Sequence, residues 1–266
     1  MSTLLKLDKL NNTRDMGGMR TGDGRVIRPG ALYRSGHLYS ASDADRVRLR
    51  DRIGLILDLR TDREREEKPD PALPGVREEH IPILSSLSAG VTRDEASDKE
   101  AFELLAQNPG EAMQYMCRIY AGFVADESCR AGYRRFLDYL LDGHDKGVLW
   151  HCTAGKDRAG FAAVIVGELL GVERAAIERD YLDTNGYLRE EVDQLIAMLQ
   201  RQYRRESPEI ERSLRLLFGA EKAFLRSAYA EAEKQFGDFG GFLSEGLRLS
   251  GAERKALQAR YLKDEN

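Results

Sequence analysis

A cysteine and an arginine six positions apart stand in a short loop between two apolar runs. The loop is segment 151–160, HCTAGKDRAG, and contains Cys152 and Arg158. The apolar run 148–150 precedes the loop, and the apolar run 161–166 follows it. This order predicts a strand, a tight loop and the start of a helix. Backbone N–H groups in such a loop form an anion nest, and the helix N-terminus adds its positive end. We interpret Cys152 as a thiolate nucleophile directed at phosphorus.

A second segment has the same cysteine-to-arginine spacing and serves as an internal control. Segment 129–135 also reads C-x-x-G-x-x-R, beginning at Cys129. Polar residues precede it, and apolar residues follow it at helical spacing, so the sequence predicts a helix over 128–142. The spacing alone is therefore a weak signal. The predicted strand before Cys152 and the predicted helix after it are the evidence that Cys152 is a nucleophile. The alternative is that Cys152 is a buried cysteine of the hydrophobic core.

The composition is that of a globular protein without a global positive field. The chain has 266 residues, 42% of them hydrophobic and 32% charged, with a net charge of −4. Attraction for phosphate must therefore be local, and we expect no nucleic-acid partner and no stable membrane insertion. The chain has three cysteines, an odd number without paired spacing, which does not predict a set of disulfide bonds. This cysteine content is typical of a protein in a reducing compartment. We expect a cytoplasmic protein, with no classical signal peptide; non-classical secretion stays open.

Strand and helix patterns alternate up to the loop. Segment 55–59 predicts a buried strand of a parallel sheet, and 32–34 and 80–84 predict further strands. This alternation predicts an α/β fold with a mostly parallel central sheet flanked by helices, and with ligands at the carboxyl ends of the strands. The charged run 60–70 is interpreted mostly as a solvated helix face.

We expect a single domain over 1–266 that is helical from 172 onward, with 186–266 as a C-terminal helical extension. Segment 86–127 contains a loop and a polar helix with apolar residues. These are either a mobile lid over the site or a core-facing helix stripe. The residues concerned are Met113, Tyr115, Met116 and Tyr120.

The loop resembles the active-site loop of cysteine-dependent protein tyrosine phosphatases. Its Lys156-Asp157 pair is similar to that of the bacterial tyrosine/serine/phosphoinositide phosphatases. Further segments fit that group, so the resemblance spans nearly the whole chain. They are 12–18 (NTRDMGG), 33–36 (YRSG), 57–60 (LDLR), 180–185 (DYLDTN) and 236–243 (FGDFGGFL). The resemblance implies a phosphatase fold, phosphorylated protein or phosphoinositide as substrate, and no cofactor or metal. The chain also has no His or Cys cluster with metal-ligand spacing.

The resemblance implies roles for individual residues. Cys152 would form a cysteinyl-phosphate, and Arg158 would bind the phosphoryl oxygens in a fork. Lys156 would add positive charge to the cradle, which in relatives goes with acceptance of phosphoinositides. The full set of phosphate-binding positions is Thr153, Ala154, Gly155, Lys156, Asp157 and Arg158. His151 would support the thiolate through the loop backbone. The other supporting residues would be Asp58, Arg60 and Arg14.

The chain departs from the family pattern at the general acid. Tyrosine phosphatases typically carry this acid in a Trp-Pro-Asp loop, but the single tryptophan here is Trp150, next to the catalytic loop. Some relatives instead have an aspartate where this chain has Ser85. Asp157 is therefore the candidate acid, with Asp58 and Asp62 as competitors.

A second departure is Ala159, where the family usually has threonine or serine. That hydroxyl normally donates a hydrogen bond to the thiolate. Two other functions share parts of the pattern. A sulfurtransferase also uses a cysteine loop after a strand, and a phosphate-binding module would use the same cradle without turnover. The position of Arg158 and the Lys-Asp pair favour the phosphatase over the sulfurtransferase.

Overall fold

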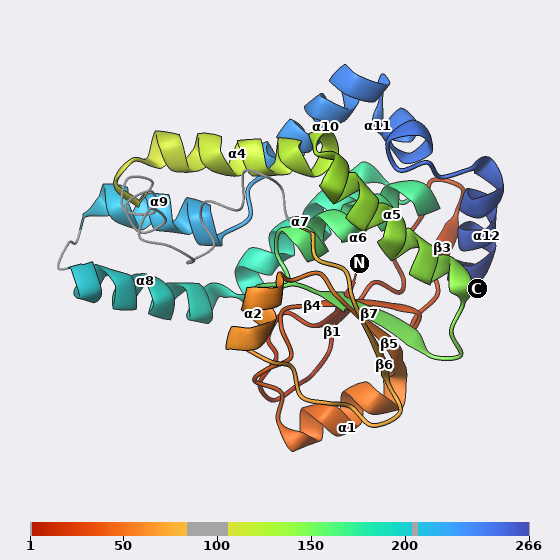
Figure 1. The fold of residues 1–266 in the computed structure, drawn as a ribbon, viewed down its shortest axis with the longest axis horizontal. Coiled ribbons are helices and arrows are strands. Elements are labelled where there is room, and N and C mark those ends of the chain that lie inside the picture. Colours follow the sequence, from red (N-terminus) through yellow and green to blue (C-terminus); the bar gives the residue numbers. More distant parts are fainter. Residues whose placement is uncertain (1, 84–105, 204–206, 266) are drawn as a thin grey trace.

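A six-stranded sheet forms the centre of the molecule in a computed structural model that describes residues 2–83, 106–203 and 207–265 (Figure 1). The strand order is β1-β2-β4-β7-β5-β6. β4, β7, β5 and β6 are parallel, and β1 and β2 join antiparallel at one edge. The strands are β1 Thr3–Leu4, β2 Arg14–Asp15, β4 Leu32–Ser35, β5 Ile53–Asp58, β6 Arg77–His80 and β7 Gly147–His151. This arrangement confirms the predicted α/β fold.

Helices flank the sheet, with α1 below it and α4 to α7 above it in the view of Figure 1. The helices are α1 Asp43–Arg52, α2 Asp62–Glu67, α4 Pro109–Ala125, α5 Glu127–Asp142, α6 Arg158–Leu170, α7 Arg174–Tyr187, α8 Arg189–Tyr203, α9 Pro208–Phe218, α10 Lys222–Phe236, α11 Phe239–Gly241 and α12 Gly251–Tyr261, with a π-helical turn η2 at Phe242–Gly246. The helices predicted over 128–142 and after the loop are confirmed as α5 and α6.

The two faces of the sheet belong to two hydrophobic cores. Leu55 and Leu57 of β5 pack with Trp150 in the larger core, whereas Ile56 and Leu149 pack in the smaller core together with Leu49 of α1. Successive strand residues point to opposite faces. The apolar run at 55–57 therefore serves both cores, as expected for a strand at the centre of a parallel sheet.

The strand predicted at 80–84 is wrong in position. The structure has β6 at Arg77–His80, at the edge of the sheet beside β5. Charged residues are common on edge strands because they discourage pairing with other chains. The apolar side chains that suggested a strand, Ile81 and Ile83, are buried beyond its end. Their N–H groups bond to the carbonyls of Asp58 and Leu59, at the end of β5.

Within the described residues, the C-terminal part is mainly helical from Arg174 onward, and it ends in the strand β8, Leu262–Asp264. β8 pairs with β3, Arg25–Ile27, in a separate two-stranded sheet. α10 packs along α4, so this part of the chain contributes to the main core. The glycine-rich segment near 236–241 separates α10 from α12 and includes the short helix α11.

Helix α4 has the character of a core helix. Met116 and Tyr120 are buried in the larger core, and Met113 and Tyr115 are half-buried against it. The core-facing stripe is therefore what the structure shows for these four residues. The remainder of the segment considered as a lid, up to residue 105, lies outside the described residues.

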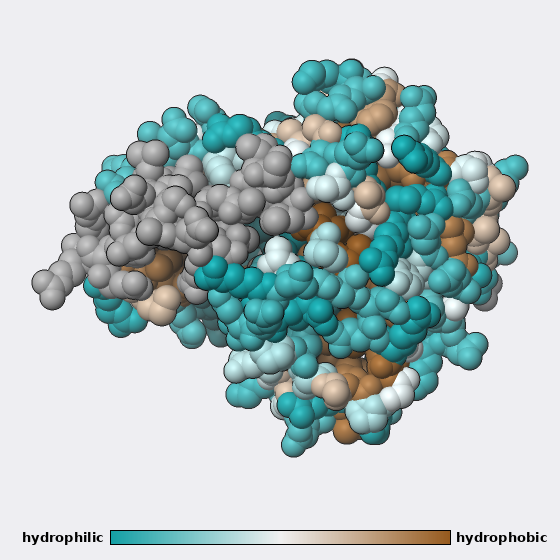
Figure 2. Space-filling view, in the orientation of Figure 1, coloured by the Kyte–Doolittle hydropathy of each residue, from teal (hydrophilic) through white to brown (hydrophobic). Residues whose placement is uncertain are grey.

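The surface seen in Figure 2 is mostly hydrophilic, and hydrophobic residues show mainly in recesses of this face. Among the described residues, no helix is both long and apolar enough to cross a membrane.

Candidate active site

The loop after β7 lies at the carboxyl ends of the parallel strands, between the ends of β4 and β5. All five residues of β7 are buried, and Cys152 follows directly with 2% of its surface exposed. The N–H of Leu59 bonds to the carbonyl of His151 at 2.9 Å, and the N–H of His37 bonds to the carbonyl of Thr153 at 3.0 Å. Segments that follow both neighbouring strands thus hold the start of the loop.

Gly155 is the position at which the loop turns against β4. Its φ is +71°, a conformation that favours glycine. A Cβ atom there would lie 2.5 Å from the carbonyl oxygen of Ser35 and 2.6 Å from the N of Gly36. The residue must therefore be glycine for both conformational and steric reasons, and its role is to shape the loop.

The N-terminus of α6 is available to an anion. Asp157 occupies the N-cap position, but its side chain makes no capping hydrogen bond. The first N–H groups of a helix have no partner within the helix. They can therefore bind an anion, with help from the helix dipole. This is the geometry expected of a phosphate cradle with Cys152 at its floor.

Arg158 is held by a carboxylate that the sequence analysis did not assign to the site. Its Nη1 and Nη2 atoms each donate to Glu64 of α2 at 2.6 Å, and Thr153 also donates its hydroxyl to Glu64. Burial by itself raises the pKa of Glu64, but the bonds from Arg158 outweigh it and hold the pKa at about 2. Glu64 belongs to the charged run interpreted as a solvated face, and that interpretation is wrong for this residue.

The geometry of the pair leaves room for phosphate. Glu64 takes the Nη1–Nη2 end of the guanidinium and does not engage Nε, while Nη2 also makes a long hydrogen bond to the hydroxyl of Thr153 at 3.4 Å. A guanidinium presents five donors and can bind two oxyanions along different edges. Glu64 is therefore suited to orienting Arg158 while the Nε edge binds a phosphoryl group.

Glu64→Gln is expected to lower kcat/KM about tenfold or more, because an amide offers one acceptor oxygen where the carboxylate offers two charged ones. The depressed pKa means that the carboxylate stabilises the fold at neutral pH, and that this contribution declines as the pH falls toward 2. Steady-state rates on a phosphotyrosine peptide measure the effect. Glu67→Gln on the same helix is the matched control, since Glu67 is 53% exposed and pairs with Arg63. Equal rates for both variants would show that Arg158 needs no orientation by Glu64.

Buried polar residues from the N-terminal segments brace the loop from behind. Arg34 on β4 donates to the carbonyl of Gly155 at 2.7 Å. Asn12 donates from its amide to the carbonyl of Ala154 at 2.9 Å. Burial lowers the pKa of Arg34 to about 10, so it stays charged at neutral pH.

Asp180 of α7 joins this brace to a second arginine. Its carboxylate accepts bonds from Arg34 at 2.7 Å and from Arg14 at 2.9 Å. Burial raises the pKa of Asp180, but the two guanidinium groups outweigh it and hold the pKa well below its usual range. Arg14 therefore supports the loop indirectly, through Asp180. This network accounts for three of the sequence segments that resembled the family.

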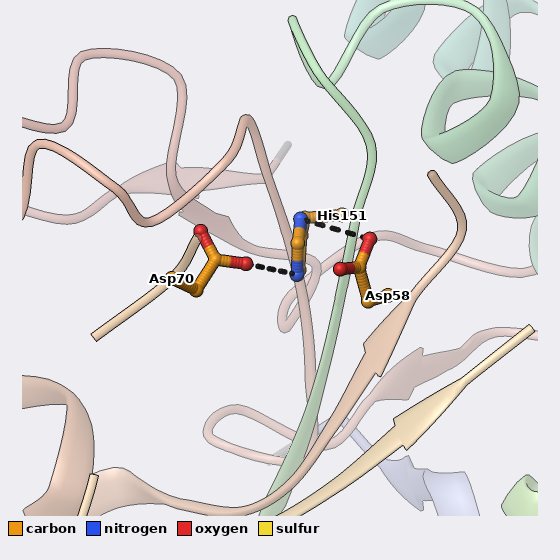
Figure 3. Close-up of side chains that lie close together, drawn as sticks. All are labelled: Asp58, Asp70 and His151. Carbon is orange, nitrogen blue, oxygen red and sulfur yellow. Dashed lines mark ion pairs between the residues drawn. The ribbon is translucent and has the colours of Figure 1, made fainter. Parts of the chain in front are cut away.

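His151 stands between two buried carboxylates, as Figure 3 shows. Its Nδ1 lies 3.3 Å from the carbonyl oxygen of Cys152 and 3.8 Å from Asp58, and its Nε2 lies 3.2 Å from Asp70. Arg60 pairs with both carboxylates, at 2.7 Å from Asp58 and 2.5 Å from Asp70. Asp58, Asp70 and His151 lie close enough to hold a metal ion. However, Arg60 already supplies a cation to both carboxylates, so we interpret the cluster as support for the loop backbone.

The three candidate acids occupy different positions. Asp58 is fully buried, and burial raises its pKa, but Arg60 and His151 outweigh this and lower it. It is therefore neither accessible nor easily protonated. The Asp62 side chain is 83% exposed and lies 3.6 Å from His80 Nδ1. The Asp157 side chain is 29% exposed and lies in the loop itself. This placement favours Asp157.

Two buried tyrosines orient Asp157. Tyr120 of α4 donates its hydroxyl to Asp157 at 2.9 Å, and Tyr181 of α7 donates to Tyr120 at 2.7 Å. Burial raises the pKa of Tyr120 well above its usual value, so it keeps its proton. From the sequence, Tyr120 was expected in a lid or a core stripe. Its contact with Asp157 was missed, because nothing in the local sequence signals a partner 37 positions away.

Lys156 directs its hydrogen bonds away from the cradle. It is 2% exposed, and its ammonium donates to the carbonyls of Leu217 at 2.7 Å and Gly219 at 2.9 Å, while Asp157 lies 3.4 Å from it. The last carbonyls of a helix lack partners within the helix, and a lysine can satisfy them. The expectation for Lys156 is therefore corrected: it fastens the loop to the end of α9.

The sequence profile of the tyrosine phosphatase family matches residues 5–263. The chain belongs to this family. It is 28% identical over 256 residues to the triple specificity protein phosphatase PtpB of Mycobacterium tuberculosis, which covers 88% of this chain and 90% of that protein. It is 35% identical to a putative tyrosine-protein phosphatase of Cupriavidus necator, over 68% of this chain and 63% of that protein. The resemblance drawn from the sequence is confirmed.

Proposed function

We propose that this tyrosine phosphatase family enzyme hydrolyses phosphotyrosine through a cysteinyl-phosphate on Cys152. The observation that carries the proposal is the placement of Cys152 before an uncapped helix N-terminus that starts with Arg158. The nucleophile, the cation and the backbone donors are then in one loop. This combination suits phosphoryl transfer, which depends mainly on positioning and charge stabilisation.

The proposed reaction has two steps. In the first, the sulfur of Cys152 attacks phosphorus, the S–P bond forms, and the ester P–O bond breaks while Asp157 gives its proton to the leaving oxygen. In the second, Asp157 takes a proton from water as the water attacks phosphorus and the S–P bond breaks. Arg158 and the backbone N–H groups stabilise the charge on the phosphoryl oxygens, as a metal ion does in other phosphatases.

The breadth of substrates rests on weaker support. The mycobacterial relative is named for triple specificity, which makes phosphoserine, phosphothreonine and phosphoinositides second candidates here. The orientation of Lys156 removes the local reason for expecting a lipid headgroup. We therefore place phosphotyrosine first.

A side-by-side comparison tests the proposal. Initial rates are measured on a phosphotyrosine peptide, a phosphoserine peptide and phosphoinositides, with thiosulfate as the sulfurtransferase substrate. We expect the highest kcat/KM on phosphotyrosine, unaffected by chelators and blocked by vanadate or iodoacetate. Activity that chelators remove and metal ions restore would contradict the cysteine mechanism. A burst of product without turnover would favour the phosphate-binding module.

Ala159→Thr is expected to raise turnover about tenfold, with iodoacetate reacting at lower pH. Ala159 is fully buried at the start of α6. A hydroxyl there can donate to the sulfur, and a hydrogen bond to a charged group contributes roughly 1.5–3 kcal/mol. The hydroxyl nearby, on Thr153, already bonds to Glu64. Ala159→Val is the control, because it adds similar bulk without a donor. If threonine and valine behaved alike, the hydroxyl would have no role.

A further inference from the structure

A cavity of about 470 Å³ lies at the end of the sheet opposite the catalytic loop. Gly147, the first residue of β7, lines it, whereas Cys152 follows the last residue of the same strand. The loop from α5 to β7 and the end of α12 complete its wall. In Figure 1 this loop lies to the right of the sheet, while α2, which carries Glu64, lies to the left. The cavity is thus separate from the catalytic loop.

Positive charge without ionic partners surrounds this cavity. Its lining includes Arg28, Arg52, Lys146 and Arg260, with Asp145 as the one carboxylate among the lining residues. None of the four cations has an ion-pair partner within residues 2–83, 106–203 and 207–265. Three of them donate to backbone carbonyls of α1 and α5, which leaves their charge unneutralised. This concentration of charge stands out in a chain whose net charge is −4.

A tyrosine also lines the cavity and presents its hydroxyl there. Tyr33 is 3% exposed and lines it, and its hydroxyl has no hydrogen bond to another residue in the described part of the chain. Burial raises the pKa of Tyr33 to about 12, so the hydroxyl keeps its proton at neutral pH. A hydroxyl at the cavity wall that has no protein partner is suited to donating to a bound ligand.

We propose that this cavity binds a small anion carrying two or more phosphoryl groups. Four cations exceed the charge of one phosphate dianion, and guanidinium groups match the geometry of phosphoryl oxygens. The four cations are exposed around an open hollow, so a small group, either a free polyphosphate or a phosphorylated lipid headgroup, can reach them. The proposal does not rest on catalysis, because none of the cavity residues belongs to the catalytic loop.

Calorimetric titration with pyrophosphate tests the proposal. Every protein in the titration carries Arg158→Ala, which removes the cation of the catalytic loop from the measurement. We expect the double variant Arg28→Gln, Arg52→Gln to bind at least tenfold more weakly than the parent, since each charge-assisted hydrogen bond contributes roughly a factor of ten. Binding to the parent should also weaken as salt is added.

The matched control is Arg212→Gln, Arg226→Gln, which removes the same charge at two exposed positions outside the cavity. Pyrophosphate binding by this control should equal that of the parent. With Arg158 restored, the cavity variant should keep wild-type phosphatase rates and the wild-type Tm, which shows that it is folded. Equal affinity of the two double variants, or no binding by the parent at low salt, would overturn the proposal.

A second arm distinguishes the two sources of the phosphoryl groups. The same proteins are sedimented with vesicles of phosphatidylcholine, with and without phosphatidylinositol bisphosphate. Pyrophosphate binding without vesicle binding supports a free anion as the ligand. Vesicle binding that depends on the bisphosphate and is lost in the cavity variant supports a lipid headgroup. If the cavity variant bound the vesicles and pyrophosphate as well as the parent does, the anion would bind outside this cavity and the proposal would be wrong.

Discussion

Cys152→Ser is expected to reduce turnover about 10⁴-fold or more while phosphate binding persists. Serine keeps the shape of the side chain, but its hydroxyl is a far weaker nucleophile than a thiolate. Binding is expected to be retained, because the donors of the loop and Arg158 are unchanged. Steady-state rates on a phosphotyrosine peptide and calorimetric titration with the same peptide measure the two effects.

The chain contains its own control for this experiment. Cys129 has the same spacing to an arginine, but it is fully buried in α5, and burial raises its pKa to about 12. It is therefore a thiol without nucleophilic character at neutral pH. Cys129→Ala should keep kcat within a few-fold of wild type. A comparable loss in both variants would mean that the effect arises from packing and not from nucleophilic attack.

The sequence was sufficient for the parts of the site that depend on neighbouring residues. The strand, the loop and the helix around Cys152 follow from hydrophobic patterning, and the turn at Gly155 needs a residue without a side chain. The segments that resembled the family are those whose buried polar groups brace the loop. Arg34 and Asn12, for example, both bond to its carbonyls. Local chemistry and family pattern therefore agree on the same residues.

What the sequence missed depends on how distant elements pack. Thr61 and Glu64 form a capping box, which predicts a helix start but not a partner for the carboxylate. The contact with Arg158 exists because α2 packs against the loop, and the two residues are 94 positions apart. Charged runs are usually solvated, so the pattern favoured the wrong interpretation.

The direction of Lys156 was missed for a similar reason. Its position in the loop suggests that it faces phosphate, but its long side chain reaches the end of α9. Asp70 was also missed, because nothing in its local sequence indicates that it lies 3.2 Å from His151. In each case the chemistry of a side chain was readable from the sequence, whereas its partner was set by tertiary packing.

Asp157→Asn is expected to lower kcat about 10²- to 10³-fold for alkyl phosphates and much less for p-nitrophenyl phosphate. Asparagine cannot give a proton to the leaving oxygen, and only a poor leaving group needs that proton. The structure favours this acid, because Asp58 is buried against Arg60, and Asp157 is oriented by the hydroxyl of Tyr120. Rates on a series of phosphate esters with leaving groups of increasing pKa measure the dependence.

Asp62→Asn is the matched control, since it makes the same change at an exposed residue near the start of α2. Its rates should stay close to wild type across the whole series. A uniform loss for Asp157→Asn, with no dependence on the leaving group, would show that Asp157 only shapes the loop. A leaving-group dependence that appeared in Asp62→Asn instead would assign the proton to Asp62, and α2 would then provide both the acid and the carboxylate that orients Arg158.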